Sequence, residues 1–446
     1  MKIHYRNFQI LLPACILLLG CGQNSADKTG DVPVIEIVQN LGKYQAVPLS
    51  RFVTELEYIP LETSYDCFMP DDFYYPIVTP THIFIRGFRF CYAFDRNGRF
   101  LGQIGSVGQG PGEYSYLTDW TIDENSQSLY LEAFRTLLEY SWDGVFRRSI
   151  RLPEHKYNFT SSNNFFVRDS LFIGHFRNHK GDLPHNFVLF DQSSEVVKSF
   201  DNHVQFKPKR ERTNWTNSAM TPYRIGEHIY VKELGNDTLF RLNGQNEIVP
   251  QFVFDIGKYT STIERREYAP PRNELWKSFP GGEIQLPLQV MIGTQNHIFF
   301  DLRARDLSGK YSFPQKRKMP TAAPSNSEFI NFQPTRISID AHTVLGIYDT
   351  ANGTTQLLDT DPVTQMMGFI NDLDGGLSFC PKYYTSDNEL VDAWRAEDMK
   401  DYLTEAYFAA HEIKNPEAHQ KLKELLENVT EFDNPVIVIA KLKPDL

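Results

Sequence analysis

A hairpin-turn pattern recurs about every fifty residues down this chain, and it limits the fold more than any other feature. In each copy, apolar residues flank a polar turn that ends near glycine, as in Phe94–Phe100. Asn-Gly and Asp-Gly pairs supply the positive φ angles that a tight β-hairpin needs. The first four copies end at Gly98, Gly144, Ser194 and Gly244, which are 46, 50 and 50 residues apart. Weaker copies end at Gly309 and Gly353.

A second marker precedes the turn at a fixed distance. A short apolar strand is predicted to begin sixteen residues before the turn residue, at His82, Ser128 and His228. The same strand begins at Ser170 and His297 with altered spacing. Further strand-like runs lie upstream of these strands, at Leu117–Asp123, Asn164–Asp169 and Met291–Thr294. Each unit therefore contains about four short strands.

Four strands per repeat at this period predict an all-β fold, a six-bladed β-propeller with four-stranded blades. A single blade cannot bury both of its faces, so the blades must stack around an axis. The six turn copies indicate six blades, and seven stay open because the last units are degenerate. A β-sandwich would not explain why the period persists along the chain.

The two ends of the propeller are predicted to close the ring together, because an open ring would leave exposed strand edges. Val34–Val38 and Val53–Leu61 are strand-like before the first turn copy, and the apolar run Asn434–Ala440 lies at the other end. We expect the final strand to complete a blade that begins near the N-terminus. Two polar stretches, Lys258–Gln285 and Phe313–Ser327, are predicted insertions.

A helical insertion at about residues 388–428 is predicted before the closing strand. Glu389–Ala410 shows apolar residues on a 3.6-residue period, and Asn415 and Pro416 are typical of the start of a second helix, which runs through Leu425. These helices are expected to pack on one face of the last blade. The propeller domain would then comprise residues 34–446.

Residues 1–20 have the character of a secretory signal peptide. Lys2 and Arg6 precede an apolar run from Phe8 to Leu19, which is short for a membrane span. The following Leu18-Leu19-Gly20-Cys21 resembles a bacterial lipobox, which implies cleavage before Cys21 and lipidation of its thiol. Residues 21–33 would be a flexible tether. The prediction is a lipid anchor in the bacterial cell envelope, at the outer membrane, with periplasmic and surface exposure both open.

Charge and cysteine content narrow the range of partners. The formal net charge is -11, and an acidic chain of this kind repels nucleic acid, so no nucleic-acid partner is expected. Without the signal peptide and the lipidated Cys21, the remaining cysteines are Cys67, Cys91 and Cys380. At most one disulfide can form among three cysteines. Cys67–Cys91 is the candidate pair, although spacing cannot fix the connectivity.

One run is similar to a known family. The stretch from Phe94 through Gly108-Gln109-Gly110-Pro111-Gly112-Glu113-Tyr114 resembles the signature of Bacteroidota-type six-bladed β-propeller lipoproteins, relatives of NHL-repeat propellers. Shorter stretches agree with it: Glu57–Thr63, Asn236–Phe240, Asn371–Gly376 and Asn434–Val436. The resemblance covers roughly residues 34–443. It implies a six-bladed propeller on a lipid anchor, and it carries no general catalytic motif.

The candidate binding residues are Asp119, Arg168 and Arg224, which are charged residues in or beside predicted inner strands. Propeller sites usually lie at the central channel, so these side chains are candidates for ligand contact. The alternative is that they form paired, channel-lining charges with no ligand.

Other patterns have simpler structural interpretations. The glycine-rich run Gly108–Tyr114 lacks the lysine and the helix of a P-loop, so we expect a blade-to-blade connection locked by Glu113 and Tyr114. His82, His228 and His297 recur at one position, but equivalent turns in a ring lie too far apart to share a metal ion. Asp372 and Asp374 do not match an EF-hand and suggest a side-chain-stabilised turn.

No catalytic motif, metal site or cofactor motif is predicted from the sequence. HExxH, GxSxG and a Rossmann GxGxxG are all absent, although distant residues can still assemble a triad. Two hypotheses follow. The first is a binding module that recognises a glycan, a peptide or a partner protein of the envelope. The second is a metal-dependent lyase, lactonase or hydrolase that uses the propeller channel.

Overall fold

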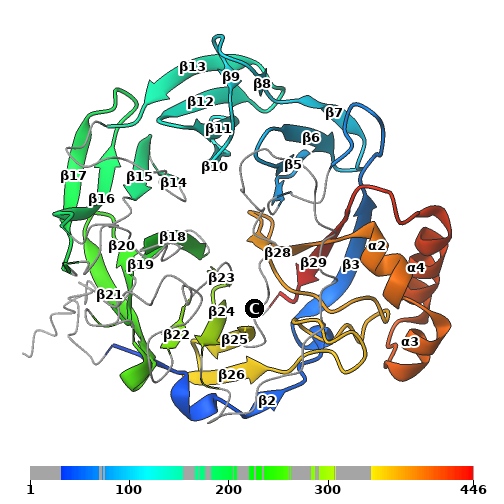
Figure 1. Cartoon of the computed structure of the whole chain (residues 1–446). Helices are drawn as coiled ribbons and strands as arrows, with labels where there is room; N and C mark the ends of the chain where they lie inside the picture. Colours follow the sequence, from blue (N-terminus) through cyan, green and yellow to red (C-terminus); the bar gives the residue numbers. More distant parts are fainter. Residues whose placement is uncertain are drawn as a thin grey trace, which may run out of the picture. The chain divides into compact units, whose positions relative to one another are not determined.

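Six antiparallel sheets follow one another around a ring in chain order (Figure 1). This computed structural model describes residues 32–69, 73, 76–153, 166–168, 170–175, 182–203, 205–207, 220–225, 228–233, 236–260, 262, 283–286, 291–305, 307 and 343–444. The chain divides into Met1–Val32 and Pro33–Leu446, and every sheet belongs to the second unit. The predicted six-bladed β-propeller is therefore confirmed.

The first three blades are consecutive four-stranded meanders. Blade 1 contains β4 (Ile77–Val78), β5 (His82–Arg86), β6 (Cys91–Asp95) and β7 (Phe100–Gln103). Blade 2 contains β10 (Asp119–Asp123), β11 (Ser128–Ala133), β12 (Thr136–Ser141) and β13 (Phe146–Arg151). Blade 3 contains β14 (Phe166–Arg168), β15 (Leu171–His175), β16 (His185–Phe190) and β17 (Val196–Asp201).

The other three blades each take a strand from the N-terminal segment. Blade 4 contains β18 (Met220–Ile225), β19 (His228–Glu233), β20 (Thr238–Leu242) and β21 (Ile248–Asp255), with β1 (Val34–Glu36) parallel to β21. Blade 5 contains β22 (Glu283–Gln285), β23 (Met291–Gly293), β24 (His297–Arg305), β25 (Thr343–Asp349) and β26 (Thr354–Leu358), with β2 (Tyr44–Gln45) at its edge. Blade 6 contains β27 (Tyr383–Tyr384), β28 (Glu389–Trp394), β29 (Val436–Leu442) and β3 (Val53–Pro60).

The hydrophobic core consists of seams between adjacent blades. Among the described residues, six clusters of buried apolar side chains each join one blade to the next, and one of them joins blade 6 to blade 1. Between blades 1 and 2, for example, Phe84 packs in the same cluster as Leu129. Each strand alternates its side chains between two faces, so both faces of every blade are buried against neighbours. The ring, and not any single blade, is the unit that excludes water.

The ring closes as predicted, by pairing strands from the two ends of the chain. The last strand, β29, pairs antiparallel with β3, from Val436 opposite Pro60 to Leu442 opposite Val53. Blade 6 therefore has three strands from the C-terminal part and its outer strand from the N-terminal part. This pairing removes the open edges that an incomplete ring would have.

The helical insertion is shorter than predicted, because Glu389–Trp394 is a strand and not a helix. Those six residues are β28, which pairs along its whole length with β29. The helices are α2 (Ala396–Tyr402), α3 (Glu405–Ala410) and α4 (Pro416–Asn428). They pack against blades 5 and 6. A short apolar run is compatible with either period, and only the partner strand decides. The side chain of Asn415 caps α4 as predicted, by accepting a hydrogen bond from the Ala418 amide (3.0 Å).

The recurring turn is the hairpin between the third and fourth strands of a blade. In five blades a side-chain oxygen at its start accepts a backbone N–H from within the turn. These residues are Asp95, Ser141, Asp191, Asn243 and Asp349. The copy ending at Gly309 follows β24 and so precedes the third strand of blade 5, and Gly309 itself lies outside the described residues. Blade 6 has no such hairpin because its third and fourth strands come from opposite ends of the chain.

The glycine-rich loop has the structural role that was predicted for it. It connects blade 1 to blade 2 and contains the parallel pair β8 (Ser106–Val107) and β9 (Glu113–Tyr114). Glu113 accepts a hydrogen bond from the Gly110 amide (2.7 Å), and the buried Tyr114 hydroxyl donates to the Ile104 carbonyl (3.1 Å). A side chain at Gly112, where φ is +73°, would place its Cβ 2.7 Å from the Phe146 ring.

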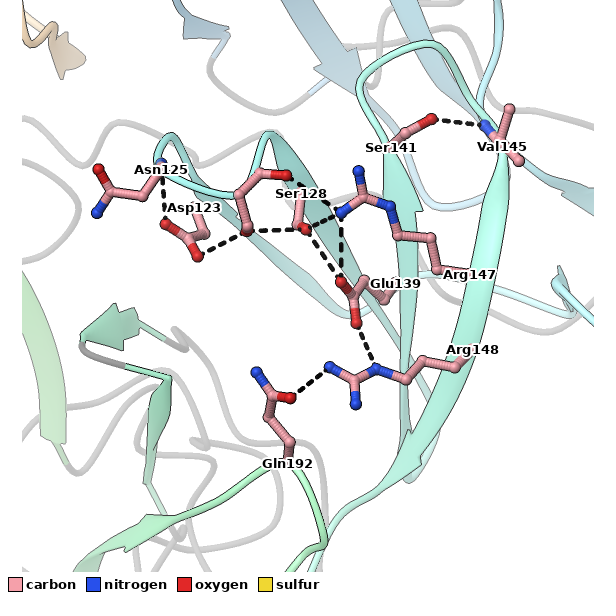
Figure 2. Close-up of polar contacts among 10 residues, drawn as sticks. Asp123, Asn125, Ser128, Glu139, Ser141, Val145, Arg147, Arg148 and Gln192 are labelled. Carbon is pink, nitrogen blue, oxygen red and sulfur yellow. Dashed lines mark hydrogen bonds and ion pairs between the residues drawn. The ribbon is translucent and has the colours of Figure 1, made fainter.

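A buried carboxylate of blade 2 is joined to blade 3 through an arginine of the outer strand β13 (Figure 2). Glu139 accepts hydrogen bonds from the Arg148 Nε (2.6 Å) and the Ser128 hydroxyl (3.0 Å). Arg148 also donates to Gln192, in the third-to-fourth-strand turn of blade 3 (2.7 Å). Burial works to raise the pKa of Glu139, but the hydrogen bonds from Arg148 and Ser128 hold it below its ordinary value.

The predicted disulfide can be checked on the described residues. Cys67, Cys91 and Cys380 are all free and buried, so the candidate Cys67–Cys91 disulfide is not formed. The Cys67 thiol instead donates to the Glu62 carbonyl (3.1 Å). Among the helices of the described residues, none is long and apolar enough to cross a membrane. The predicted signal peptide and Cys21 lie outside the described residues, as do Phe313–Ser327 and most of Lys258–Gln285.

Candidate binding site

Each blade has two edges of different character. Because the strands are antiparallel, the turns between strands 1 and 2 and between strands 3 and 4 lie along one edge, here called the turn edge. The connection between strands 2 and 3, and the connections to neighbouring blades, lie along the other, here called the connection edge. No link on the turn edge exceeds five residues, whereas the link from β28 to β29 on the connection edge runs from Arg395 to Pro435. Variable loops on a rigid scaffold are the usual place for binding residues.

An ionisable side chain lies at one equivalent position in five of the six blades, near the connection edge. The position is on the second strand, four residues after the residue that begins it. We call this set the ionisable ring: Arg86, Glu132, His175, Lys232 and Asp301. All five side chains are buried, with at most 5% of any residue exposed. Charged residues are rarely buried unless they are paired, so five at one position is unusual for a structural core.

Every member of the ionisable ring faces the next blade in chain order. The residue two positions earlier on each strand packs in the hydrophobic seam with that next blade, as Phe84 does with blade 2. Side chains two residues apart on a strand point to the same face, so the ionisable group continues each seam toward the connection edge. Blade 6 has Ala393 at this position, where it packs on the seam with blade 1.

Arg86 joins blades 1 and 2 at this position. Its guanidinium donates to the carbonyl oxygens of Thr118 (3.1 Å) and Leu117 (3.5 Å), and it lies 4.0 Å from the Asp119 carboxylate. It also lies over the Trp120 ring, 5.7 Å from the centroid. Asp119 is buried at the start of β10. The predicted binding residue Asp119 is therefore the ion-pair partner of a ring member.

Lys232 and His175 occupy the position in blades 4 and 3. Lys232 donates to the backbone carbonyl of Asn236, which follows β19, and its ammonium lies 5.9 Å from the centroid of the Phe254 ring. His175 has its ring 5.6 Å from that of Phe187. The position therefore holds a cation in blades 1 and 4, an imidazole in blade 3 and an acid in blades 2 and 5.

Asp301 and a second buried carboxylate, Asp392, both lie close enough to the Cys380 thiol to act on it electrostatically. Asp392 of β28 accepts hydrogen bonds from the Cys380 amide (2.8 Å) and from the Trp394 indole (3.3 Å). Lys382 donates to the Cys380 sulfur (3.1 Å). Burial raises the pKa of Asp392 and of the Cys380 thiol, and the negative charges of Asp392 and Asp301 raise that of the thiol further. Among the described residues, no group of three or more His, Cys, Asp or Glu side chains could hold a metal ion.

The three predicted binding residues lie on the first strands of blades 2, 3 and 4, as expected. Asp119 is in β10, Arg168 in β14 and Arg224 in β18. These strands lie nearest the centre of the ring, whereas β13, β17 and β21 lie at its outside (Figure 1). The side chains of Arg168 and Arg224 lie outside the described residues. Their role in binding stays a prediction.

The other sequence patterns have structural roles. The strands β5, β19 and β24 begin at His82, His228 and His297, which confirms that these histidines are strand-start residues. Asp374 accepts hydrogen bonds from the Gly376 amide (3.0 Å) and the Tyr58 hydroxyl (2.7 Å), which confirms a side-chain-stabilised turn.

The ionisable ring was missed by sequence reasoning, although its signal was present. Four of its members stand four residues after the marker positions His82, Ser128, His228 and His297. The fifth, His175, is displaced by one place relative to Ser170. The candidate residues predicted from the sequence lie on the first strands, whereas the repeated ionisable position lies on the second strands.

Comparison with known proteins places the chain in a family. The model of a domain of unknown function, DUF4934, matches residues 32–441. The chain belongs to this family. A crystal structure of a protein from Bacteroides fragilis NCTC 9343 has 19% sequence identity and a TM-score of 0.60, and the match covers 92% of this chain and 99% of that one. The resemblance to six-bladed propellers of Bacteroides is thus confirmed at the level of the fold.

More distant structures are similar to this DUF4934 chain as well. A DUF4221 family member from Bacteroides vulgatus ATCC 8482 has 12% identity and a TM-score of 0.44, with 88% of this chain and 97% of that chain covered. Virginiamycin B lyase of Staphylococcus aureus has 10% identity and a TM-score of 0.31, with 60% and 75% covered. Likeness at these TM-scores says nothing about activity. No curated protein matches the chain.

Proposed function

We propose that this DUF4934 protein is a lipid-anchored binding module of the bacterial cell envelope, with its ligand site on the connection edges of the blades. The observation that carries the proposal is the ionisable ring. Five ionisable side chains in one equivalent, buried position cost desolvation energy that apolar residues would avoid. Ionisable side chains gathered at one buried position are therefore candidates for a functional site.

The distribution of loop length supports the same edge. Links on the turn edge are uniformly short, whereas the connection edge contains the glycine-rich loop and the helices α2 to α4. A glycan, a peptide or an envelope protein is the expected ligand class. These ligands are recognised by a few polar groups set among apolar and aromatic side chains, which is what the seams provide.

The expected envelope location rests on the N-terminal sequence and on one relative. Lys2, Arg6, the apolar run to Leu19 and the lipobox-like residues before Cys21 support export and lipidation. The Bacteroides fragilis protein of similar fold is named as a presumed exported protein. Kinship with NHL-repeat propellers and placement at the outer membrane belong to this proposal.

Binding is tested with residues 33–446 on an oligosaccharide array and on a peptide library, using the variants Lys232→Met and Asp301→Asn. The expected result is at least one ligand class whose Kd weakens about tenfold in both variants, because each variant removes a buried charge beside the connection edge. Lys441→Met is the matched control, because Lys441 is a half-exposed lysine on β29 whose partner is Glu55. The proposal is wrong if nothing binds, or if the ring variants bind as tightly as wild type while remaining folded.

Anchoring is tested separately with the full chain expressed in a Gram-negative host. Wild type should enter the detergent phase on phase partition, and mass spectrometry should find a diacylglyceryl-modified N-terminal peptide beginning at Cys21. Cys21→Ser should stay in the aqueous phase. An unmodified wild-type chain in the aqueous phase would remove the anchor and leave the binding proposal untouched.

A further inference from the structure

Three aromatic side chains are exposed on the connection edges of blades 1 and 2. Phe88 is 39% exposed, Tyr116 42% and Phe134 66%. Phe88 lies between β5 and β6, Phe134 lies between β11 and β12, and Tyr116 lies on the connection that enters β10. Each is thus at a loop of the connection edge, where the proposed function places the ligand. Exposed aromatic side chains that gather at one place are a mark of binding surfaces.

Backbone hydrogen bonds hold the three segments side by side. The Leu117 amide donates to the Phe88 carbonyl (2.7 Å), and the Thr118 amide donates to the Glu132 carbonyl (2.9 Å). Tyr116 therefore lies between the tips that carry Phe88 and Phe134. The second tip is fixed further, because the Leu152 amide donates to the Arg135 carbonyl (2.9 Å). The aromatic groups are presented by short, hydrogen-bonded segments and not by long loops.

Phe134 is in a backbone conformation that a phenylalanine rarely adopts. Its φ is +59°, in the left-handed region that favours Gly, Asn and Asp at a two-residue hairpin tip. This backbone conformation destabilises the fold, and the exposed Phe134 ring offsets little of that cost because it buries little apolar surface. Such strain, once observed, points to a functional demand on the side chain.

Both tips carry the dipeptide Phe-Arg. Phe88 is followed by Arg89, which is exposed, and Phe134 by Arg135, which is half-buried. No acidic residue occurs at 87–90, 115–118 or 133–136. The chain as a whole is acidic, with a net charge of -11, whereas these three short stretches contain two arginines and no acidic residue. A guanidinium binds carboxylate or sulfate oxygens through two parallel N–H groups.

We propose that Phe88, Tyr116 and Phe134, with Arg89 and Arg135, bind an anionic glycan, a sugar chain that carries carboxylate or sulfate groups. This inference rests on the proposed function and names the ligand class for its site. The apolar C–H face of a sugar ring packs on an aromatic ring, whose π face is negative. The acidic substituents then pair with the two arginines. A ligand that is both ring-faced and acidic uses both chemistries at once.

Four probes separate the two chemistries and the two sources of charge. Polygalacturonate offers ring faces with carboxylates, heparin offers ring faces with sulfates, dextran offers ring faces without charge, and poly-L-glutamate offers carboxylates without ring faces. Residues 33–446 should bind polygalacturonate or heparin at least about tenfold more tightly than dextran and poly-L-glutamate. Preference between the first two identifies the acidic group. Equal binding of poly-L-glutamate would overturn the inference in favour of an acidic peptide, and equal binding of dextran would overturn the role of charge.

The variants make the test independent of folding. Phe134→Asn places a residue suited to the positive φ, so its melting temperature should rise while binding weakens about tenfold. Arg89→Gln should weaken binding of the acidic glycan and flatten its salt dependence. Val145→Thr is the matched control, because Val145 is 63% exposed on the turn edge of the same blade. The inference fails if Phe134→Asn gains stability and binds as wild type.

The outcomes distinguish this inference from the proposed function. If another ligand binds and responds to Lys232→Met but not to Phe134→Asn, the aromatic site is wrong and the binding module stands. If an acidic glycan binds and responds to Phe134→Asn alone, the ionisable ring is not part of its site. If neither the four probes nor the array and the peptide library yield a ligand, both proposals fall together.

Discussion

The turn edges and the connection edges of the blades differ in how much they vary. On the turn edge, five blades use the same solution, in which a side-chain oxygen accepts backbone N–H groups of its own hairpin, as Asp95 does for the Asn97 amide (2.9 Å) and the Arg99 amide (3.0 Å). On the connection edge, the described segments differ in length and in structure: blade 2 has the two-residue Phe134-Arg135 tip, and blade 6 has three helices. Under the proposed function, a repeat that is uniform on one edge and varied on the other separates stability from recognition.

The uniform edge also holds neighbouring blades together. The Gly98 carbonyl accepts a hydrogen bond from the Glu62 amide, just after the outer strand of blade 6 (2.8 Å). The Ser194 hydroxyl donates to the Arg151 carbonyl at the end of β13. The turn between strands 3 and 4 of a blade thus contacts the segment that leaves the preceding blade. Its repetition is explained by this contact as well as by the hairpin itself.

The largest effect is expected from Gly98→Ala. At this turn φ is +80°, and an added Cβ would overlap the carbonyl oxygen of Pro60 on β3. Backbone strain and overlap together should lower the free energy of unfolding by about 4 kcal/mol, measured by urea denaturation. β3 cannot move away from the added Cβ without losing its pairing with β29.

Gly244→Ala is the matched control for that change. Gly244 is in the corresponding turn of blade 4, but an added Cβ there would meet nothing within 4 Å, and the positive φ falls on Asn246 instead. We expect a change of less than about 0.5 kcal/mol. A loss as large as that of Gly98→Ala would show that turn glycines matter for some reason other than contact with the preceding blade.

A smaller, pH-dependent effect is expected on the connection edge at His411. Its Nε2 lies 2.6 Å from the Asp361 carboxylate and its Nδ1 lies 2.8 Å from the Tyr407 carbonyl. Both partners are acceptors, so the protonated imidazole can donate to both of them. The hydrogen bond to Asp361 raises the pKa of His411 above its ordinary 6.5, although burial acts against the charge. Loss of the pair in His411→Gln should cost about 3 kcal/mol at pH 6.

The sign of the pH dependence follows from that raised pKa. A group whose pKa is higher in the folded state stabilises the fold fully below its unfolded pKa, and the contribution is lost as pH rises through the folded pKa. The difference between wild type and His411→Gln should therefore shrink from pH 6 upward. His203→Gln, at an exposed histidine, is the matched control. A constant difference from pH 6 to about 10 would mean that His411 acts by packing alone.

The turn edge could be predicted from the sequence, and the connection edge could not. Hairpin turns depend on local sequence. A turn is predicted at Asn243-Gly244 or at Asp143-Gly144 without knowledge of the surrounding structure. The period of those turns indicated the blade number, and the apolar run Asn434–Ala440 indicated the closure by β29. The copy at Gly309 entered the count although it follows β24, and blade 6 lacks the hairpin, so the correct total of six rested partly on offsetting errors.

What the sequence could not supply depends on distant partners. Glu389–Trp394 fits a helical period, and only its pairing with β29, more than forty residues away, makes it a strand. Arg86 belongs to a site because β10 of the next blade places Asp119 and the Thr118 carbonyl beside it. The strain at Phe134 is a backbone angle, which no residue pattern states.

The smallest effect is expected from Asp191→Ala, which tests whether a turn side chain supports its own hairpin only. The Asp191 carboxylate accepts hydrogen bonds from the Ser193 amide (2.8 Å) and the Glu195 amide (3.0 Å) and is half-buried. Removing it should cost about 1 kcal/mol in urea denaturation, because water can replace part of what is lost. Asp191→Asn keeps the accepting oxygen and should cost less than half of that. If the alanine variant instead loses as much as Gly98→Ala, each turn must hold the ring and not merely its own blade. The turns of all blades would then stabilise the ring cooperatively. Stability and the proposed recognition would be separated between the two edges of the whole propeller and not within each blade.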